Sequence, residues 1–293
     1  VHFEPNSNNC TLTENVICRN LIDIKDLDAN SGDENTCNTP DGWDDDGTTG
    51  CTYSCPSGWC YDYTISDWIN PPTTGDWNVT HVVECNNTDI TLNGNLRISK
   101  ELRFNNVHLM MNVTDMETPP PYTIEVSGTG TFLINSKGGF PSIIENGENK
   151  SAYFTFQVRK GARFEMRNSE LRNCGFAWNL PDYDWAGLWI ATDGVIIENS
   201  LIEHNHFIGI FFYNSSNHAI SNNVIRSNDW YGILGINSMG NQINNNEITL
   251  NGEDGISLSG ASNSVITNNI ANLNGEDGIE LSNAPNSIIT HNT

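Results

Sequence analysis

The last third of the chain alternates apolar and polar residues over short stretches, and the pattern recurs every 23 residues. Four glycines, each followed by isoleucine, mark the step: Gly209, Gly232, Gly255 and Gly278. One isoleucine column and two asparagine columns keep the same register: Ile197, Ile220, Ile243, Ile266 and Ile289; Asn205, Asn228, Asn251 and Asn274; and Asn223, Asn246, Asn269 and Asn292. A step of this length, held so strictly, predicts stacked supersecondary units and not a globular domain.

Each repeat predicts three short strands. Between two repeat glycines the apolar residues fall in the pieces Gly255–Ser259, Ser264–Ile266 and Asn268–Ala271, which are rich in β-branched residues and too short for helices. Three strands per turn, bent at Asn and Gly, predict an all-β, right-handed parallel β-helix with coils about 4.8 Å apart. Isoleucines would then stack into a core, and each asparagine amide would bond to the same amide one coil away.

Several motifs carry a family resemblance: Asn222–Asn228, Asn245–Asn251, and Asn-Gly-Glu-Asp-Gly-Ile, which occurs at 251–256 and again at 274–279. They resemble the right-handed parallel β-helix proteins of the NosD and pectate-lyase-like group, especially secreted archaeal surface proteins. Similar stretches at 92–98 and 160–171 extend the resemblance over residues 76–293. It implies the fold and a surface location, but not an activity, because this fold serves lyases, hydrolases, accessory proteins and structural modules.

Residues 1–75 differ in kind and are predicted to form a cysteine- and aspartate-rich cap or appended segment. Seven of the eight cysteines lie in or just after it, and the eighth lies among the repeats: Cys10, Cys18, Cys37, Cys51, Cys55, Cys60, Cys85 and Cys174. Paired Cys-x-x-Cys zinc knuckles do not occur, so disulfides and an oxidising compartment are favoured. An even count predicts that no thiol stays free, which requires Cys174 to bond one of the other seven.

The formal net charge of −23 argues against nucleic acid and anionic membranes as partners, and favours cation binding or a strongly solvated exterior. No run of 18 apolar residues predicts a membrane span, and the chain opens at Val1 without a signal-peptide pattern, so we expect a processed, extracellular or cell-surface form. N-linked glycans are expected on more than half of six sequons, at Asn9, Asn78, Asn86, Asn112, Asn149 and Asn214.

The acidic run in the first segment is a candidate calcium loop. Its oxygen donors are Asp26, Asp28, Asn30, Asp41, Asp44, Asp45 and Asp46. Calcium takes 6 to 8 oxygen ligands from a flexible chain, but Ser31 stands where an EF-hand loop has glycine. A calcium site and a merely solvated acidic loop therefore both remain open.

The sharpest local feature is a turn that changes character along the repeats. Its residues are aromatic in the earlier coils and acidic in the later ones: Trp185, Phe207, Trp230, Tyr231, Glu253, Asp254, Glu276 and Asp277. Aromatic rings beside carboxylates are typical of sugar-binding sites. The alternative is that Trp185 and Trp230 pack under an inserted loop at 175–186.

Catalysis is disfavoured, although the enzyme question stays open. A glycosidase needs two carboxyl groups in different environments, whereas repetition predicts identical ones, and no Lys or Arg follows Arg226. Copper is also disfavoured. The imidazoles of His204 and His206 would lie side by side only if the chain bends there, and the methionines Met110, Met111 and Met116 lie elsewhere.

Together these patterns predict a secreted, glycosylated structural or adhesive protein, with a polysaccharide-binding or polysaccharide-cleaving β-helix as the alternative. Ile288, Ile289, Asn292 and Thr293 are still in repeat register. An uncapped coil would expose backbone amides and core, so we expect either head-to-tail self-assembly into a filament or further coils in a longer chain.

Overall fold

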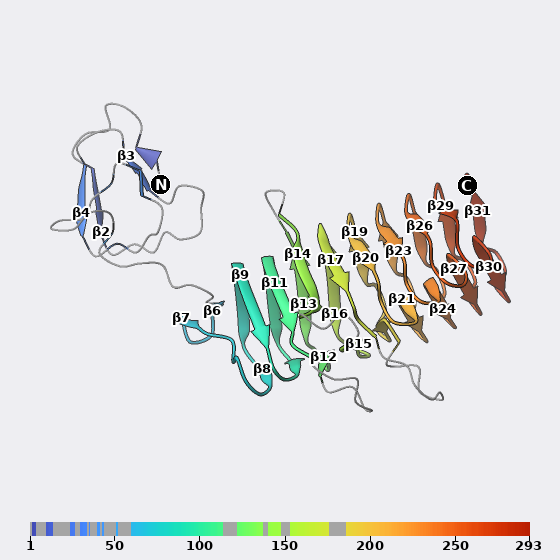
Figure 1. Ribbon diagram of the computed structural model, residues 1–293, viewed down its shortest axis with the longest axis horizontal. Helices are drawn as coiled ribbons and strands as arrows, with labels where there is room; N and C mark the ends of the chain where they lie inside the picture. Colours follow the sequence, from blue (N-terminus) through green and yellow to red (C-terminus); the bar gives the residue numbers. More distant parts are fainter. Residues whose placement is uncertain are drawn as a thin grey trace. The chain divides into compact units, whose positions relative to one another are not determined.

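The computed structural model describes residues 60–113, 122–136, 140–147, 153–175 and 186–293, with short stretches of the first 58 residues (2–3, 10–13, 24–26, 30–33, 35, 40–41, 43 and 51). The chain divides into two units, Val1–Gly58 and Trp59–Thr293. The second unit is the predicted parallel β-helix (Figure 1), and the first strand of its coils begins at Trp77.

The coils of the β-helix run through three faces, and strands pair in parallel with their equivalents in the next coil. Face 1 contains β8 (Trp77–Val79), β10 (Leu96–Ile98), β12 (Thr123–Val126), β15 (Thr155–Val158), β18 (Leu188–Ile190), β21 (Ile208–Tyr213), β24 (Tyr231–Ile236), β27 (Ile256–Ser259) and β30 (Ile279–Ser282). Face 2 contains the first halves of β9 (Val82–Leu92) and β11 (Glu101–Met111), then β13 (Thr131–Asn135), β16 (Arg163–Arg167), β19 (Ile196–Glu198), β22 (Ala219–Ser221), β25 (Gln242–Asn244), β28 (Val265–Thr267) and β31 (Ile288–Thr290). Face 3 contains the second halves of β9 and β11, then β14 (Ser142–Asn146), β17 (Ser169–Arg172), β20 (Leu201–Glu203), β23 (Val224–Arg226), β26 (Glu247–Thr249) and β29 (Ile270–Asn272).

The start of the β-helix is covered by a hairpin. Strands β6 (Cys60–Asp62) and β7 (Asp67–Ile69) are antiparallel, and β6 pairs antiparallel with β9. A Cys60–Cys85 disulfide joins the hairpin to β9, which confirms the predicted use of disulfides. The buried Asp62 carboxylate accepts hydrogen bonds from His81 and from the amides of Thr64 and Ile65. Burial raises the pKa of Asp62, but these bonds outweigh it and the pKa lies below its ordinary value.

The first unit contains two small parallel sheets. One consists of β1 (His2–Phe3), β3 (Ile24–Asp26) and β5 (Pro40–Asp41), and the other of β2 (Thr11–Thr13) and β4 (Ser31–Asp33). Ile24 and Trp43 are buried together against Leu12 and Cys51. No helix in the part of the chain that the structure describes is long and apolar enough to cross a membrane.

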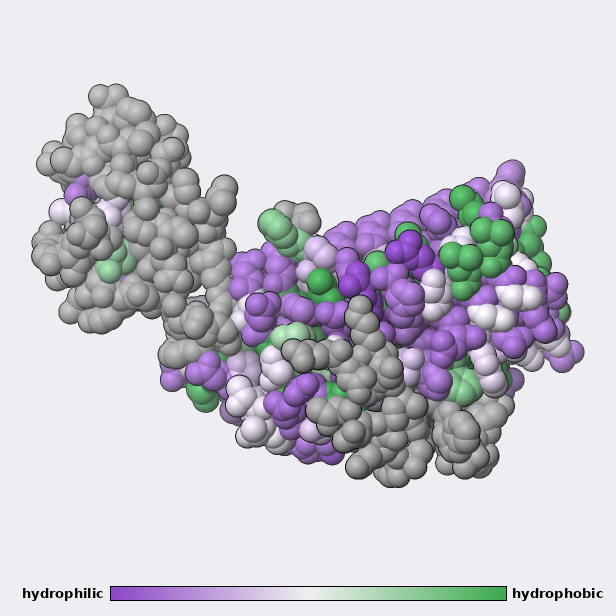
Figure 2. Space-filling view, viewed as in Figure 1, coloured by the Kyte–Doolittle hydropathy of each residue, from purple (hydrophilic) through white to green (hydrophobic). Residues whose placement is uncertain are grey.

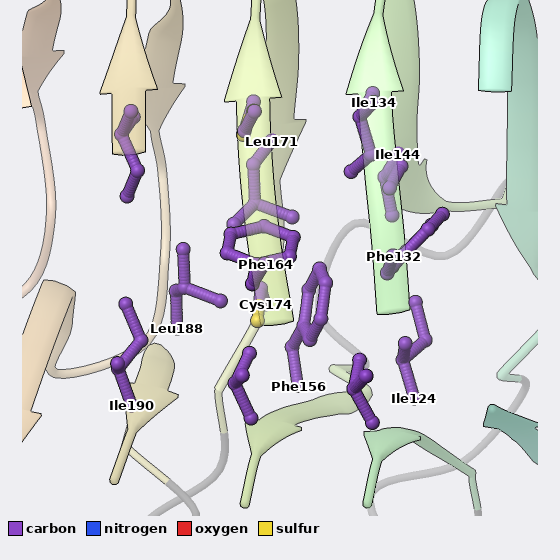
Figure 3. Close-up of a cluster of buried hydrophobic side chains, with 14 of the residues drawn as sticks. Ile124, Phe132, Ile134, Ile144, Phe156, Phe164, Leu171, Cys174, Leu188 and Ile190 are labelled. Carbon is purple, nitrogen blue, oxygen red and sulfur yellow. The ribbon is translucent and has the colours of Figure 1, made fainter. Parts of the chain in front are cut away.

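The core runs along the β-helix axis and changes composition on the way. In the later coils isoleucine columns line all three faces, and Ile220, Ile225 and Ile233 are fully buried. In the earlier coils Phe132, Phe156 and Phe164 fill the same space (Figure 3). The glycine column has a steric cause, because a Cβ at Gly232 would lie 2.6 Å from the Gly255 carbonyl oxygen and 2.7 Å from Ile248 Cγ2.

Asparagines turn the chain between face 2 and face 3, at what we call corner 2–3. The residue at the bend adopts positive φ in eight coils: Asn87, Asn106, Asn168, Asn199, Asn222, Asn245, Asn268 and His291. Asparagine tolerates this left-handed conformation better than most residues do. Asn168 and Asn199 occupy equivalent positions, which confirms that this coil has 31 residues. The predicted loop at 137–150 is partly wrong, because it contains strand β14.

In the later coils the residue after each bend forms a hydrogen-bonded ladder along the axis, and it is buried in all but the last coil. At corner 2–3, Asn223 donates its backbone and side-chain N–H groups to Asn246 Oδ1, each at 3.0 Å, and Asn246 does the same to Asn269. The corner between faces 3 and 1, corner 3–1, repeats this through Asn205, Asn228, Asn251 and Asn274. The predicted amide stacking is therefore confirmed at both asparagine columns.

The third ladder, at corner 1–2 between faces 1 and 2, has a mixed composition. His218, Asn241, Ser264 and Ser287 follow one another, and each except the first accepts a hydrogen bond from the backbone N–H of the one before it. His218 stacks on Phe212 with ring centroids 4.1 Å apart, and Nε2 lies 3.1 Å from Ser215 Oγ. Burial lowers the pKa of His218 to about 4.

Cys174 contradicts the prediction that all eight cysteines pair. It occupies the corner 3–1 ladder place above Asn205, whose Oδ1 accepts the Cys174 N–H at 2.9 Å. The thiol is buried and free, and burial raises its pKa well above the ordinary value. Cys10 is also free, so the full-pairing prediction is wrong for both residues. Cys51 is disulfide-bonded, and Cys18, Cys37 and Cys55 lie outside the described residues.

We predict that Asn246→Ala lowers the free energy of unfolding by about 2–5 kcal/mol. The substitution leaves the Asn223 N–H groups and the Ile220 carbonyl without these hydrogen-bond partners inside the protein. The neighbouring exposed Asn245→Ala should cost about 1 kcal/mol, from the left-handed backbone alone. Chemical denaturation of both variants measures the difference. Equal losses would contradict a dominant role for the ladder.

A second prediction concerns pH. The pKa of His218 is lower in the folded than in the unfolded state, so the unfolded state binds more protons and stability falls as pH drops from about 6.5 to 4, by about 3 kcal/mol. His218→Asn, which copies Asn241 one coil later, should flatten this part of the stability profile. The exposed His204→Asn is the control and should leave the slope unchanged. A His218 variant with the original slope would refute the assignment.

Candidate functional site

The predicted aromatic and acidic residues line one side of corner 3–1. The backbone N–H of Trp230 donates to the Phe207 carbonyl at 2.7 Å, and Glu253 donates to Trp230 at 2.8 Å. Glu276 continues the column by donating to Glu253 at 3.3 Å. Trp185 lies outside the described residues. The structure thus brings the other members of the predicted column together in consecutive coils.

Four rings form a contiguous line at the earlier coils, which we call the aromatic row. Tyr153 stacks on His206 at 4.7 Å, His206 meets Phe207 edge to face at 4.4 Å, and Phe207 meets Trp230 at 4.5 Å. Asp229 Oδ2 lies 2.5 Å from His206 Nδ1 and so orients the imidazole. Trp230 is 42% exposed, while Trp185 and nearly all of the inserted loop at 175–186 lie outside the described residues. The row therefore offers ring surface to a ligand.

The later coils carry the carboxylates. Asp254 is buried and accepts the Asp277 N–H at 2.9 Å, whereas the Asp277 side chain is exposed. Burial raises the pKa of Asp254, the Asp277 amide lowers it and the nearby Glu280 raises it, with the net pKa above the ordinary value. Burial and the same carboxylates raise the pKa of Tyr231. Asp254 and Asp277 thus differ in burial, and Asp277 belongs to the last coil of the described chain.

A cavity of about 460 Å³ opens beside the aromatic row, over the end of face 3. Its lining is almost wholly polar: Glu145, Tyr153, Arg172, Asn173, Glu203, His204, Ser227 and Asp229. Tyr153 belongs to both the row and the cavity, and burial followed by the charge of Asp229 raises its pKa. A second hollow of about 640 Å³ lies at the other edge of face 3, where Phe140 and Pro141 stand over Leu201 and Val224.

Acidic and basic side chains alternate on the outer side of face 3, and several of them line the two hollows. Arg172 Nε lies 3.0 Å from Glu203 Oε1, and Arg226 Nε lies 2.9 Å from Glu203 Oε2. Arg172 also contacts Glu170 at 2.5 Å and Glu145 at 3.9 Å. Glu203 is buried, and a buried carboxylate needs such partners. The guanidinium groups are therefore occupied by carboxylates of the protein, and the site as a whole is acidic.

Residues considered for metals are not grouped in the described part of the chain. No cluster of three or more His, Cys, Asp or Glu side chains is placed there to hold an ion. Of the copper candidates, His206 bonds Asp229, His204 points to the cavity, Met111 is in the core, Met110 is half-buried and Met116 lies outside the described residues. Of the calcium candidates, Asn30 Oδ1 accepts the Cys10 N–H at 2.8 Å, Asp26 and Asp41 lie on strands, and Asp28, Asp44, Asp45 and Asp46 lie outside the described residues.

The sequons differ in exposure. Asn78 and Asn214 are exposed, whereas Asn86 and Asn112 are half-buried. The side-chain amides of Asn86, Asn112 and Asn214 are hydrogen-bonded. Asn9 and Asn149 lie outside the described residues.

A family model described as the right handed beta helix region matches residues 160–293, and no curated protein matches the chain. The fold is therefore a parallel β-helix, and the family model covers its coils from residue 160 onward. It is similar to a crystal structure of a double mutant of the periplasmic alginate epimerase AlgG (16% identity, TM-score 0.42) and to the A-module of the Azotobacter vinelandii mannuronan C-5 epimerase AlgE6 (16% identity, TM-score 0.36).

These similarities are partial. The alignment covers 74% of this chain and 61% of the AlgG chain, and 69% of this chain and 66% of the AlgE6 module. We transfer no activity from either protein.

Proposed function

We infer that the protein binds a polysaccharide outside the cytoplasm, with the sugar chain lying against the aromatic row and over the adjacent cavity. The observation that carries this proposal is the unbroken line of rings from Tyr153 to Trp230 beside a cavity lined with carboxylates, amides and hydroxyls. Sugar rings pair an apolar face with a rim of hydroxyls, and this combination of surfaces complements both. The Cys60–Cys85 disulfide supports an extracytoplasmic location.

The charge of the site indicates which polymer fits. Arg172 and Arg226 are bonded to Glu203, while Glu145 and Asp229 also face the cavity. A polyuronate would bring further carboxylates to this acidic surface without a free guanidinium to pair them. A neutral or amine-bearing polysaccharide avoids that repulsion. We therefore favour such a glycan.

Binding is favoured over cleavage. Asp254 and Asp277 lie in the later coils, whereas the cavity is lined by residues up to Asp229. The structural or adhesive role and the head-to-tail assembly expected from the sequence remain predictions. For the glycans, we favour Asn78 and Asn214 as the occupied sequons of the described residues, because their side chains are exposed.

We predict that Trp230→Ala weakens glycan binding about tenfold, or about 1.4 kcal/mol, because it removes the exposed ring at the end of the aromatic row. Isothermal titration calorimetry with hexamers of N-acetylglucosamine, glucosamine and a uronic acid measures both the loss and the charge preference.

Tyr63→Ala is the matched control, since Tyr63 is a half-exposed aromatic on the hairpin at the other end of the β-helix. It should bind like the wild type. Equal losses in both variants, or binding of none of the three hexamers, would refute the proposed site.

A further inference from the structure

Two leucines occupy bend positions at which the fold does not require an apolar residue. Leu250 and Leu273 occupy the bend of corner 3–1, where Asn173, His204 and Ser227 stand in the preceding coils. Their φ angles are 59° and 56°, in the left-handed region that is uncommon for residues other than Gly, Asn and Asp. Their side chains are 56% and 75% exposed. Neither backbone preference nor core packing accounts for leucine at these two bends.

The exposure of Leu250 is a property of the corner. Leu250 lies between two complete neighbours, because β26 pairs with β23 on one side and with β29 on the other. Ile270, on the outer side of β29, is 45% exposed. Figure 2 shows hydrophobic residues gathered on the surface of these coils. We call Leu250, Ile270 and Leu273 the apolar corner.

Carboxylates surround the apolar corner. Glu247 pairs with Ile270 across adjacent strands, while Glu253, Glu276 and Asp277 follow the two leucines at the turn. No Lys or Arg occurs from residue 227 to residue 293. The surface therefore combines apolar anchors with uncompensated negative charge, and its natural complement is apolar in the middle and positive at the rim.

We propose that the apolar corner and its carboxylates dock a cationic amphipathic polypeptide segment, in which apolar side chains are flanked by Lys or Arg. The leucines are one coil apart, about 4.8 Å, and a helix advances 5.4 Å per turn. A helix lying along the solenoid axis therefore presents successive turns of its apolar stripe to Leu250 and Leu273. A glycan fits less well, because these side chains offer no ring faces.

The proposal is tested with a fluorescent 18-residue peptide of Leu and Lys whose leucines follow helical periodicity, measured by fluorescence anisotropy. Two control peptides are a scrambled sequence of the same composition and the same periodic sequence with Glu in place of Lys. The periodic Lys peptide should bind the full chain, and binding should weaken as salt is raised. The scrambled peptide should bind roughly tenfold more weakly or less, and the Glu peptide should not bind.

The decisive variant is Leu250→Asn with Leu273→Asn, since asparagine adopts the left-handed bend readily. Peptide binding should fall roughly tenfold or more, while the melting temperature stays equal or rises and glycan binding at the aromatic row is unchanged. Glu253→Gln with Glu276→Gln should weaken binding and reduce its salt dependence. Full peptide binding by the leucine variant, equal binding of the scrambled peptide, or a fall in the melting temperature of the leucine variant would each overturn the proposal.

Discussion

The structure depends on one interaction: the hydrogen bond that a backbone N–H of one coil donates to the buried side-chain oxygen of the next coil. A solenoid corner takes backbone N–H and carbonyl groups out of the strand pairing, and inside a protein such groups are costly unless they find partners. In Asn223, Asn228, Asn246 and Asn251 one amide oxygen accepts from the preceding coil, while the side-chain nitrogen donates to a carbonyl and to the next amide. This satisfies the corner and sets the register of all three faces at once.

The ladder also positions the site. At corner 3–1 the buried asparagine holds the turn that follows it, so Phe207, Trp230, Glu253 and Glu276 emerge from the same place in consecutive coils. The side chain can therefore change from ring to carboxylate without disturbing the backbone. The aromatic row and the acidic surface beside the apolar corner are two chemical surfaces displayed on one scaffold, and a substitution in one leaves the geometry of the other intact.

The regular coils could be predicted from the sequence because the physical requirement recurs at a constant step. The isoleucine columns, the two asparagine ladders and the aromatic-to-acidic turn all lie where the 23-residue register predicts. The rest depends on coils of irregular length. Tyr153 stacks on His206 across such a coil, and Arg172 meets Glu203 over the 31-residue step, so no constant spacing signals either contact. The predicted disulfide at Cys174 is wrong for the same reason. Cys174 is a ladder residue, but the 23-residue register that would identify it as one is interrupted just after it.

Because the sequence of corner 3–1 repeats, the acidic surface extends along the axis in steps of one coil. Asn-Gly-Glu-Asp-Gly-Ile occurs at 251–256 and again, letter for letter, at 274–279, with leucine before it both times. Duplication or deletion of one such coil would lengthen or shorten the acidic surface by about 4.8 Å and leave every bond within the remaining coils unchanged, because coils contact only their neighbours. A β-helix of this kind can therefore match a longer or shorter partner by gaining or losing whole coils.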